Sequence, residues 1–147
     1  DDLTSDKILN DLQNLSPDLI VLAGFLKKIP EKIIDLFRNK IVNIHPSLLP
    51  KYGGKGMFGI NVHKSVIENN EEYSGFTIHY VNKNYDEGTI IKQYETKLSK
   101  KETIGNNDDL EIFTNQSINK IESLSVLANQ RMAMSILCLL SGGVRSP

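Results

Sequence analysis

The sequence predicts an α/β fold in which helices flank a mostly parallel sheet. Two short apolar runs, residues 19–23 and 41–44, have the length and the β-branched content of strands buried on both faces. Between them an amphipathic pattern typical of a helix begins at Pro30, a residue that suits a first helical turn. Because a strand, a helix and a strand over this length form a crossover unit, we expect the two strands to be parallel.

The remaining elements are expected in order around this unit. A first helix begins at Ser5 or Asp6, which can cap it, and ends near Leu15. A further helix covers residues 60–69, where apolar positions recur at helical spacing. Residues 75–94 then read as a hairpin, because two strand patterns flank a loop of turn-forming residues.

Beyond residue 101 the pattern is weaker. Residues 99–109 have the composition of a polar linker, and a helix is predicted from Thr114 or Ser117 to Leu140. We therefore divide the chain into a catalytic core, residues 1–101, and an atypical, partly helical tail, residues 102–147.

Composition narrows the classes of function. The chain has 147 residues, of which 39% are hydrophobic and 24% charged, as expected for a folded globular protein. A net charge of -1 argues against a nucleic-acid or membrane partner. The single cysteine, Cys138, fits a reducing compartment, and the first residues lack the basic region of a secretory signal, so we expect a cytoplasmic protein. No metal-ligand spacing occurs, and no metal is expected.

Two polar side chains mark the end of the second predicted strand. Asn43 and His45 are two residues apart, so they share one face, and Pro46 ends the strand. In open α/β sheets ligands bind at the carboxyl ends of strands, and an amide with an imidazole suits acyl chemistry. The alternative is structural: Asn43 satisfies the backbone at a strand end and His45 caps a loop.

Three other features carry weaker signals. The glycine-rich, basic loop at residues 51–59 lacks the order of a phosphate-binding loop and favours a flexible loop beside a site. His63, in the predicted third helix, is interpreted as a packed or surface histidine rather than a catalytic one. Asp86 and Gly88 are, taken alone, ordinary turn residues.

Three separated motifs resemble a known family. Residues 18–25 (DLIVLAGF), 43–52 (NIHPSLLPKY) and 85–88 (YDEG) closely resemble the phosphoribosylglycinamide formyltransferases of purine synthesis, in the formyltransferase superfamily. The resemblance covers about residues 5–97 and implies a Rossmann-like formyltransferase fold. Members of that family begin with a strand and a loop that holds the substrate phosphate, and we expect this sequence to start after that segment. The family's later contacts to the ribonucleotide also have no match beyond residue 97.

The resemblance also implies an activity, the transfer of a formyl group from 10-formyltetrahydrofolate to the amine of glycinamide ribonucleotide. His45 would be the proton donor, Asn43 would hold the formyl oxygen, Asp86 would raise the pKa of His45, and His79 would lie behind them. The partners would be these small molecules, and a homodimer is left open. The positions that would bind the folate are Leu26, Lys27, Lys28, Ile29, Asn43, Asn82, Lys83, Asn84, Tyr85 and Asp86.

Other functions remain open at this point. Formyltetrahydrofolate hydrolase, methionyl-tRNA formyltransferase and sugar-amine formyltransferases share the Asn-x-His pair and the later aspartate. A non-catalytic folate-binding fragment, or a module whose tail docks on a partner, belongs to a different class. Because the phosphate loop is expected to be missing, we expect the isolated chain to bind folate weakly and to transfer formyl groups to glycinamide ribonucleotide poorly or not at all.

Overall fold

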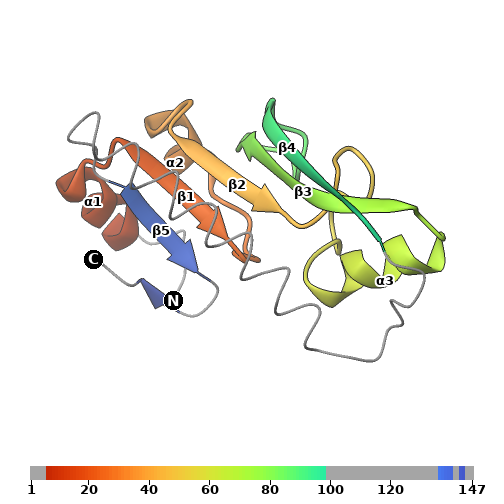
Figure 1. The fold of residues 1–147 in the computed structure, drawn as a ribbon. Coiled ribbons are helices and arrows are strands. Elements are labelled where there is room, and N and C mark those ends of the chain that lie inside the picture. Colours follow the sequence, from red (N-terminus) through yellow and green to blue (C-terminus); the bar gives the residue numbers. More distant parts are fainter. Residues whose placement is uncertain (1–5, 99–135, 141–142, 145–147) are drawn as a thin grey trace.

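The computed structural model describes residues 6–98, 136–140 and 143–144 (Figure 1). The elements expected within residues 6–98 are confirmed, including the hairpin, and Pro30 lies at the cap position just before the second helix. The elements are α1 (Asp6–Leu15), β1 (Leu19–Ala23), α2 (Glu31–Leu36), β2 (Ile41–His45), α3 (Ile60–Glu68), β3 (Tyr73–Tyr80), β4 (Ile90–Lys97), β5 (Ile136–Leu140) and β6 (Gly143–Val144).

The described strands form a sheet in the order β4-β3-β2-β1-β5-β6. β1 pairs in parallel with both β2 and β5, which confirms the α/β class and the parallel crossover. The expectation of a mostly parallel sheet holds for these central strands, whereas β3, β4 and β6 add antiparallel pairings and make the sheet mixed. Figure 1 shows the reason: α3 lies near the carboxyl end of β2, so the chain enters β3 from that end.

The predicted helix that ends at Leu140 is wrong for its last residues. Ile136–Leu140 is the strand β5, paired with β1 along its whole length. A short apolar run fits a buried helix and a central strand equally well, so periodicity alone does not separate them. The rest of that predicted helix lies outside the described residues, and the division at residue 101 stays a prediction.

The main core lies on the face of the sheet that α1 and α2 cover. Leu12 of α1 and Ile33 of α2 belong to one buried cluster with Ile20 and Ile41, which are neighbours across β1 and β2. Since side chains alternate along a strand, Ile41 shares this face with Asn43 and His45. The core therefore ends where the polar residues of β2 begin. Within the described residues no helix has the length and apolar character needed to cross a membrane.

Candidate active site

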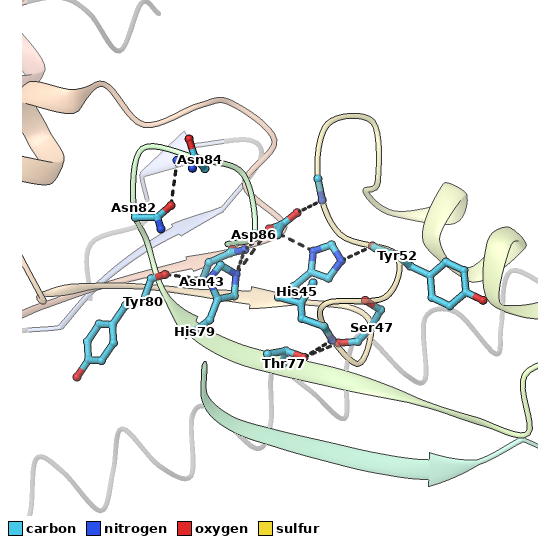
Figure 2. Close-up of polar contacts among 12 residues, drawn as sticks. Asn43, His45, Ser47, Tyr52, Thr77, His79, Tyr80, Asn82, Asn84 and Asp86 are labelled. Atoms are coloured by element: carbon cyan, nitrogen blue, oxygen red, sulfur yellow. Dashed lines mark hydrogen bonds and ion pairs between the residues drawn. The ribbon is translucent and has the colours of Figure 1, made fainter. Parts of the chain in front are cut away.

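The end of β2 carries the polar pair that the sequence analysis singled out. Asn43 pairs with His79 and His45 with Thr77 across the antiparallel neighbour β3, so these side chains lie side by side (Figure 2). The Asn43 Nδ2 atom is 3.1 Å from His79 Nε2 and donates to Asp86 Oδ1 at 3.5 Å. Both predicted residues, Asn43 and His45, thus face a shared cluster that also holds Asp86.

Asp86 brings this cluster together from the loop between β3 and β4. Its Oδ1 atom is 3.5 Å from His45 Nδ1 and 3.6 Å from His79 Nε2, and its Oδ2 atom accepts a hydrogen bond from the Gly54 N–H at 2.9 Å. The backbone of Asp86 has a φ of 55°, a left-handed conformation that aspartate tolerates better than most residues. The loop is also tight, because a Cβ at Gly88 would overlap the Tyr80 carbonyl.

The contacts of His45 define where its proton lies. The residue is 3% exposed, and its Nε2 atom is 2.7 Å from the Tyr52 carbonyl oxygen. Both the Tyr52 carbonyl and the Asp86 carboxylate only accept, and the shorter contact, 2.7 Å against 3.5 Å, assigns the proton of the neutral ring to Nε2, with Nδ1 facing Asp86. The sequence analysis missed the part played by Tyr52, because it acts through its main chain and no side-chain pattern reports that.

The pKa of His45 is lowered from its ordinary value. Burial is the main cause and His79 adds to it, while the charge of Asp86 and the Tyr52 carbonyl act in the opposite direction. The contribution of Asp86 has the expected upward direction, and the net shift is downward because burial has the larger effect. Because the net shift is downward, the free protein holds His45 mainly neutral at neutral pH.

Asp86 stays ionised in the same environment. Burial raises the pKa of Asp86, but the hydrogen bonds with His79 and the Gly54 N–H and the electrostatic interactions with the two histidines outweigh it, and the net shift is downward. His79 is fixed as well, because its Nδ1 atom lies 2.9 Å from the Tyr80 carbonyl and must carry a proton there. A charged carboxylate thus lies between two oriented imidazoles.

A cavity of about 360 Å³ opens beside this cluster. Apolar side chains that the sequence analysis did not assign, Phe25, Met57 and Phe58, form part of its wall. Lys28 lies 5.9 Å from the centre of the Tyr85 ring, so two loops meet at the cavity. All the expected folate-binding positions line it except Lys83, namely Leu26, Lys27, Lys28, Ile29, Asn43, Asn82, Asn84, Tyr85 and Asp86.

His63 is half-buried on α3, and its pKa is lowered by burial and by the nearby charge of His45. It does not line the cavity. Among the described residues no cluster of histidine, cysteine, aspartate and glutamate side chains suits a metal ion. The polar cluster beside this cavity therefore offers an amide, two imidazoles and a carboxylate for chemistry.

Known proteins resemble this chain over most of its length. The family model described as "Formyl transferase" matches residues 2–116. The chain is 44% identical over 103 residues to a chloroplastic phosphoribosylglycinamide formyltransferase of Arabidopsis thaliana, covering 70% of this chain and 35% of that protein. It is 41% identical over 103 residues to a methionyl-tRNA formyltransferase of Macrococcus caseolyticus, covering 70% of this chain and 32% of that protein.

Solved structures agree with these relatives. The phosphoribosylglycinamide formyltransferase of Bacillus halodurans aligns with a TM-score of 0.61 at 31% identity, over 76% of this chain and 52% of that one. The enzyme of that name from Streptococcus pneumoniae aligns with a TM-score of 0.68 at 27% identity, over 84% of this chain and 64% of that one. The chain spans about a third of the length of the curated relatives, 35% of the Arabidopsis protein and 28% of the one from Vigna unguiculata.

Proposed function

Because the chain belongs to the formyl transferase family, we propose that it transfers a formyl group from 10-formyltetrahydrofolate to the amine of glycinamide ribonucleotide, in purine biosynthesis. One observation carries this proposal: Asn43 and His45 of β2 meet Asp86, from a distant part of the sequence, at the edge of one cavity. The choice of acceptor is supported by the relatives named phosphoribosylglycinamide formyltransferase in Arabidopsis thaliana and Haemophilus influenzae.

The reaction moves one proton and replaces one C–N bond. The acceptor amine attacks the formyl carbon, and negative charge develops on the formyl oxygen of the tetrahedral intermediate. The amine then loses a proton, the nitrogen of the folate takes one up, and the bond between that nitrogen and the formyl carbon breaks. No nucleophile of the protein takes part, so the protein has to stabilise charge and carry a proton.

His45 is suited to carry that proton in both directions. Since burial lowers its pKa, it is ready to accept a proton from the attacking amine. The imidazolium formed in this way faces the Asp86 carboxylate, which favours the charged ring while it persists. It then donates the proton to the departing folate nitrogen. In this proposal His45 is first base and then acid, rather than a resting proton donor.

Asn43 is proposed to stabilise the formyl oxygen. Its Nδ2 atom contacts His79 and Asp86, so it has to exchange one of these partners in order to donate to a substrate. A single such donor contributes roughly 10²–10³-fold to the rate of reactions with an oxyanion intermediate. Replacing Asn43 therefore should lower kcat more than it changes the affinity for folate.

We propose that the cavity holds the flat ring system of the folate. A volume of about 360 Å³ is within the range of small-molecule sites, and apolar side chains such as Leu26 and Phe58 line it together with the polar loop at residues 82–86. These walls would hold an apolar ring face while main-chain groups of the loops would bind its polar edge. The remaining length of a folate would extend toward the mouth of the cavity.

A methionyl-tRNA acceptor is the second candidate, because relatives at up to 41% identity carry that name. The net charge of -1 argues against it, since a tRNA-binding surface needs an excess of basic residues.

We propose the cytoplasm as the compartment on the evidence of the single cysteine. Two plant relatives are named as chloroplastic, so fractionation of the source cells is the test.

The decisive experiment supplies 10-formyltetrahydrofolate with either glycinamide ribonucleotide or methionyl-tRNA, and measures tetrahydrofolate and formylated product separately. We expect slow formation of formylated glycinamide ribonucleotide by the parent chain, its loss in His45→Ala and its retention in His63→Ala, which removes a histidine outside the cavity. Formylated tRNA would favour the second candidate. Tetrahydrofolate without formylated product would indicate hydrolysis instead, and binding of folate without turnover would indicate a non-catalytic fragment.

A further inference from the structure

Tyr52 connects the candidate catalytic histidine to a surface ion pair. Its carbonyl oxygen lies 2.7 Å from His45 Nε2, while its side-chain hydroxyl donates to Glu71 Oε1 at 2.9 Å. The same Glu71 oxygen accepts a hydrogen bond from Lys51 Nζ at 2.7 Å. One residue therefore contacts the active site through its backbone and the α3–β3 turn through its ring (Figure 2 shows the first contact).

The backbone of Tyr52 needs outside support. Its φ is 56°, in the left-handed region, which costs an aromatic residue energy and persists only where surrounding contacts impose it. The hydroxyl contact with Glu71 supplies such support on the side-chain end. A hydrogen bond from the Ser47 hydroxyl to the Lys51 carbonyl, at 2.7 Å, holds the preceding residue. Glu71 is itself anchored, because its N–H donates to the Val66 carbonyl at 3.2 Å.

The orientation of this carbonyl determines the tautomer of His45. While the carbonyl faces Nε2, that nitrogen holds the proton and Nδ1 presents its lone pair toward Asp86. If the carbonyl moved away, the neutral ring would gain by placing its proton on Nδ1, where it could donate to the carboxylate. The unprotonated nitrogen would then be Nε2, and Nδ1, the nitrogen that faces Asp86, could no longer accept a proton from the amine.

We propose that Tyr52 and Glu71 are positioning residues for His45. The Glu71 carboxylate holds the Tyr52 hydroxyl, this contact fixes the left-handed backbone of Tyr52, and the Tyr52 carbonyl keeps the proton of His45 on Nε2. The kinetic consequence rests on the proposed function, whereas the consequence for the His45 ring does not.

The electrostatic groups around His45 make this contact measurable. The Tyr52 carbonyl raises the pKa of His45 against the larger effect of burial, and the other titratable groups that influence it are Asp86 and His79. His63 is in turn influenced by His45. The Glu71 carboxylate has a lowered pKa, because it accepts hydrogen bonds from Lys51 and Tyr52. Glu71 is thus charged at neutral pH and its partner hydroxyl stays a donor.

The test is an NMR titration of the full chain with labelled histidine rings, in the parent and in four variants. Tyr52→Phe keeps the aromatic ring and removes the hydroxyl, and Glu71→Ala removes its acceptor. Lys51→Met is the matched control, since it removes the ion pair at Glu71 and leaves the Tyr52 contact. Glu71→Gln is the conservative rescue, because its amide oxygen still accepts from the hydroxyl.

We expect Tyr52→Phe and Glu71→Ala to shift the His45 tautomer toward Nδ1–H and to lower the pKa of His45, whereas Lys51→Met and Glu71→Gln resemble the parent. In formyl transfer the same two variants should lose about tenfold in kcat, with KM for the folate nearly unchanged. A folded Tyr52→Phe chain that keeps the parent's tautomer and His45 pKa overturns the proposal. If the two variants change the His45 tautomer as expected but the parent chain formylates no acceptor, the proposed function is refuted and the positioning role remains supported.

Discussion

At the scale of single residues, Asp86 combines a charge that the site uses with a backbone conformation that few residues tolerate. Its φ of 55° suits asparagine almost as well as aspartate, but not alanine. Asp86→Asn therefore removes the charge alone, whereas Asp86→Ala also introduces backbone strain. The pair of variants separates the electrostatic from the structural part of this residue.

We expect both variants to lose activity to a similar extent, about a hundredfold in kcat/KM, because each removes the carboxylate that favours the His45 imidazolium. In addition, Asp86→Ala should lower the free energy of unfolding by about 1 kcal/mol relative to Asp86→Asn. Steady-state kinetics and denaturant unfolding measure the two effects. Parent-like kcat/KM in a folded Asp86→Asn chain would show that the charge is dispensable.

Burial of His45 also predicts how stability depends on pH. The pKa of His45 in the folded chain lies below its ordinary value of 6.5, so on acidification the unfolded chain takes up this proton first. The free energy of unfolding should therefore fall as the pH drops below about 6.5, and continue to fall until it passes the folded-state pKa. His63 adds a change of the same sign, since burial lowers its pKa as well.

In His45→Gln the free energy of unfolding should depend less steeply on pH between about pH 7 and 5. The variant lacks one of the histidines that take up a proton on unfolding in this range. His63→Gln is the matched comparison, and a double variant should be shallower than either. Denaturant unfolding at a series of pH values gives the slopes. Equal slopes for the parent and His45→Gln would mean that His45 binds its proton equally well in the folded and unfolded chain.

Sequence reasoning found some of these residues for a physical reason that also explains what it missed. Asn43 and His45 were predictable because strand alternation and Pro46 place them at a strand end. Asp86 lies in a loop of ordinary turn-forming residues, and only the family resemblance predicted that it belongs to the site. The net pKa shift of His45 depends on burial by distant segments, which no local pattern contains.

At the scale of elements, Thr77 of β3 is hydrogen-bonded to the loop that follows His45, residues 46–49. Its hydroxyl donates to the Ser47 carbonyl at 2.6 Å and accepts from the Leu49 N–H at 3.0 Å, and the residue is fully buried. Gln93 of β4 donates to the same hydroxyl at 2.9 Å and to the Leu49 carbonyl at 2.8 Å. The hairpin β3–β4 thus holds residues 46–49 in place through a buried polar network.

Thr77→Val keeps the shape and removes the hydroxyl, which leaves buried backbone groups of Ser47 and Leu49 without this partner. We expect a loss of about 2–3 kcal/mol in the free energy of unfolding. Thr77→Ser, which keeps the hydroxyl and loses a methyl group, should cost only about 1 kcal/mol. Denaturant unfolding compares the two. A larger cost for serine than for valine would show that packing, rather than the polar network, holds the loop.

The helices and strands were largely predictable where turn-forming residues mark both ends of an apolar pattern. Glycine, proline and polar turns delimit β1, β2 and α3, and the structure confirms them. The apolar residues of Ile136–Leu140 have no such boundary at their start, and they form a strand because β1 offers a parallel partner. That partner is more than a hundred residues away in sequence, so local propensity could not identify it.

At the scale of the whole molecule, the candidate site lies where the sheet changes direction. β2 pairs in parallel with β1, so its carboxyl end lies next to the β1–α2 loop. β3 is antiparallel and ends beside the amino end of β2, where Tyr80 pairs with Val42, so the β3–β4 loop turns back along β2 to bring Asp86 to His45. The first loop supplies cavity residues such as Leu26, and the second supplies Asp86. Residues far apart in sequence therefore meet there because one loop follows the parallel strand β1 and the other folds back from the end of β3.

The strand order also predicts which backbone amides exchange slowly with solvent. The Ile20 N–H donates to the Lys40 carbonyl at 2.7 Å, on the β2 side of β1. Because successive amides of a strand point to opposite sides, the Val21 N–H points to the β5 side, where Val21 is paired with Cys138. We expect the amide hydrogens of Ile20 and Val21 to exchange at similarly low rates, near that of global unfolding.

Strand β4 provides the internal comparison. It is paired on one side within the described sheet and its side chains are mostly exposed, so its outward amides should exchange much faster than those of β1. Hydrogen exchange followed residue by residue measures both strands in one sample. Slow exchange at Ile20 with fast exchange at Val21 would make β1 an edge strand and contradict its pairing with β5. Slow exchange at both would place β1 inside the sheet, so that the strand leading to Leu26 and the cavity is held from two sides.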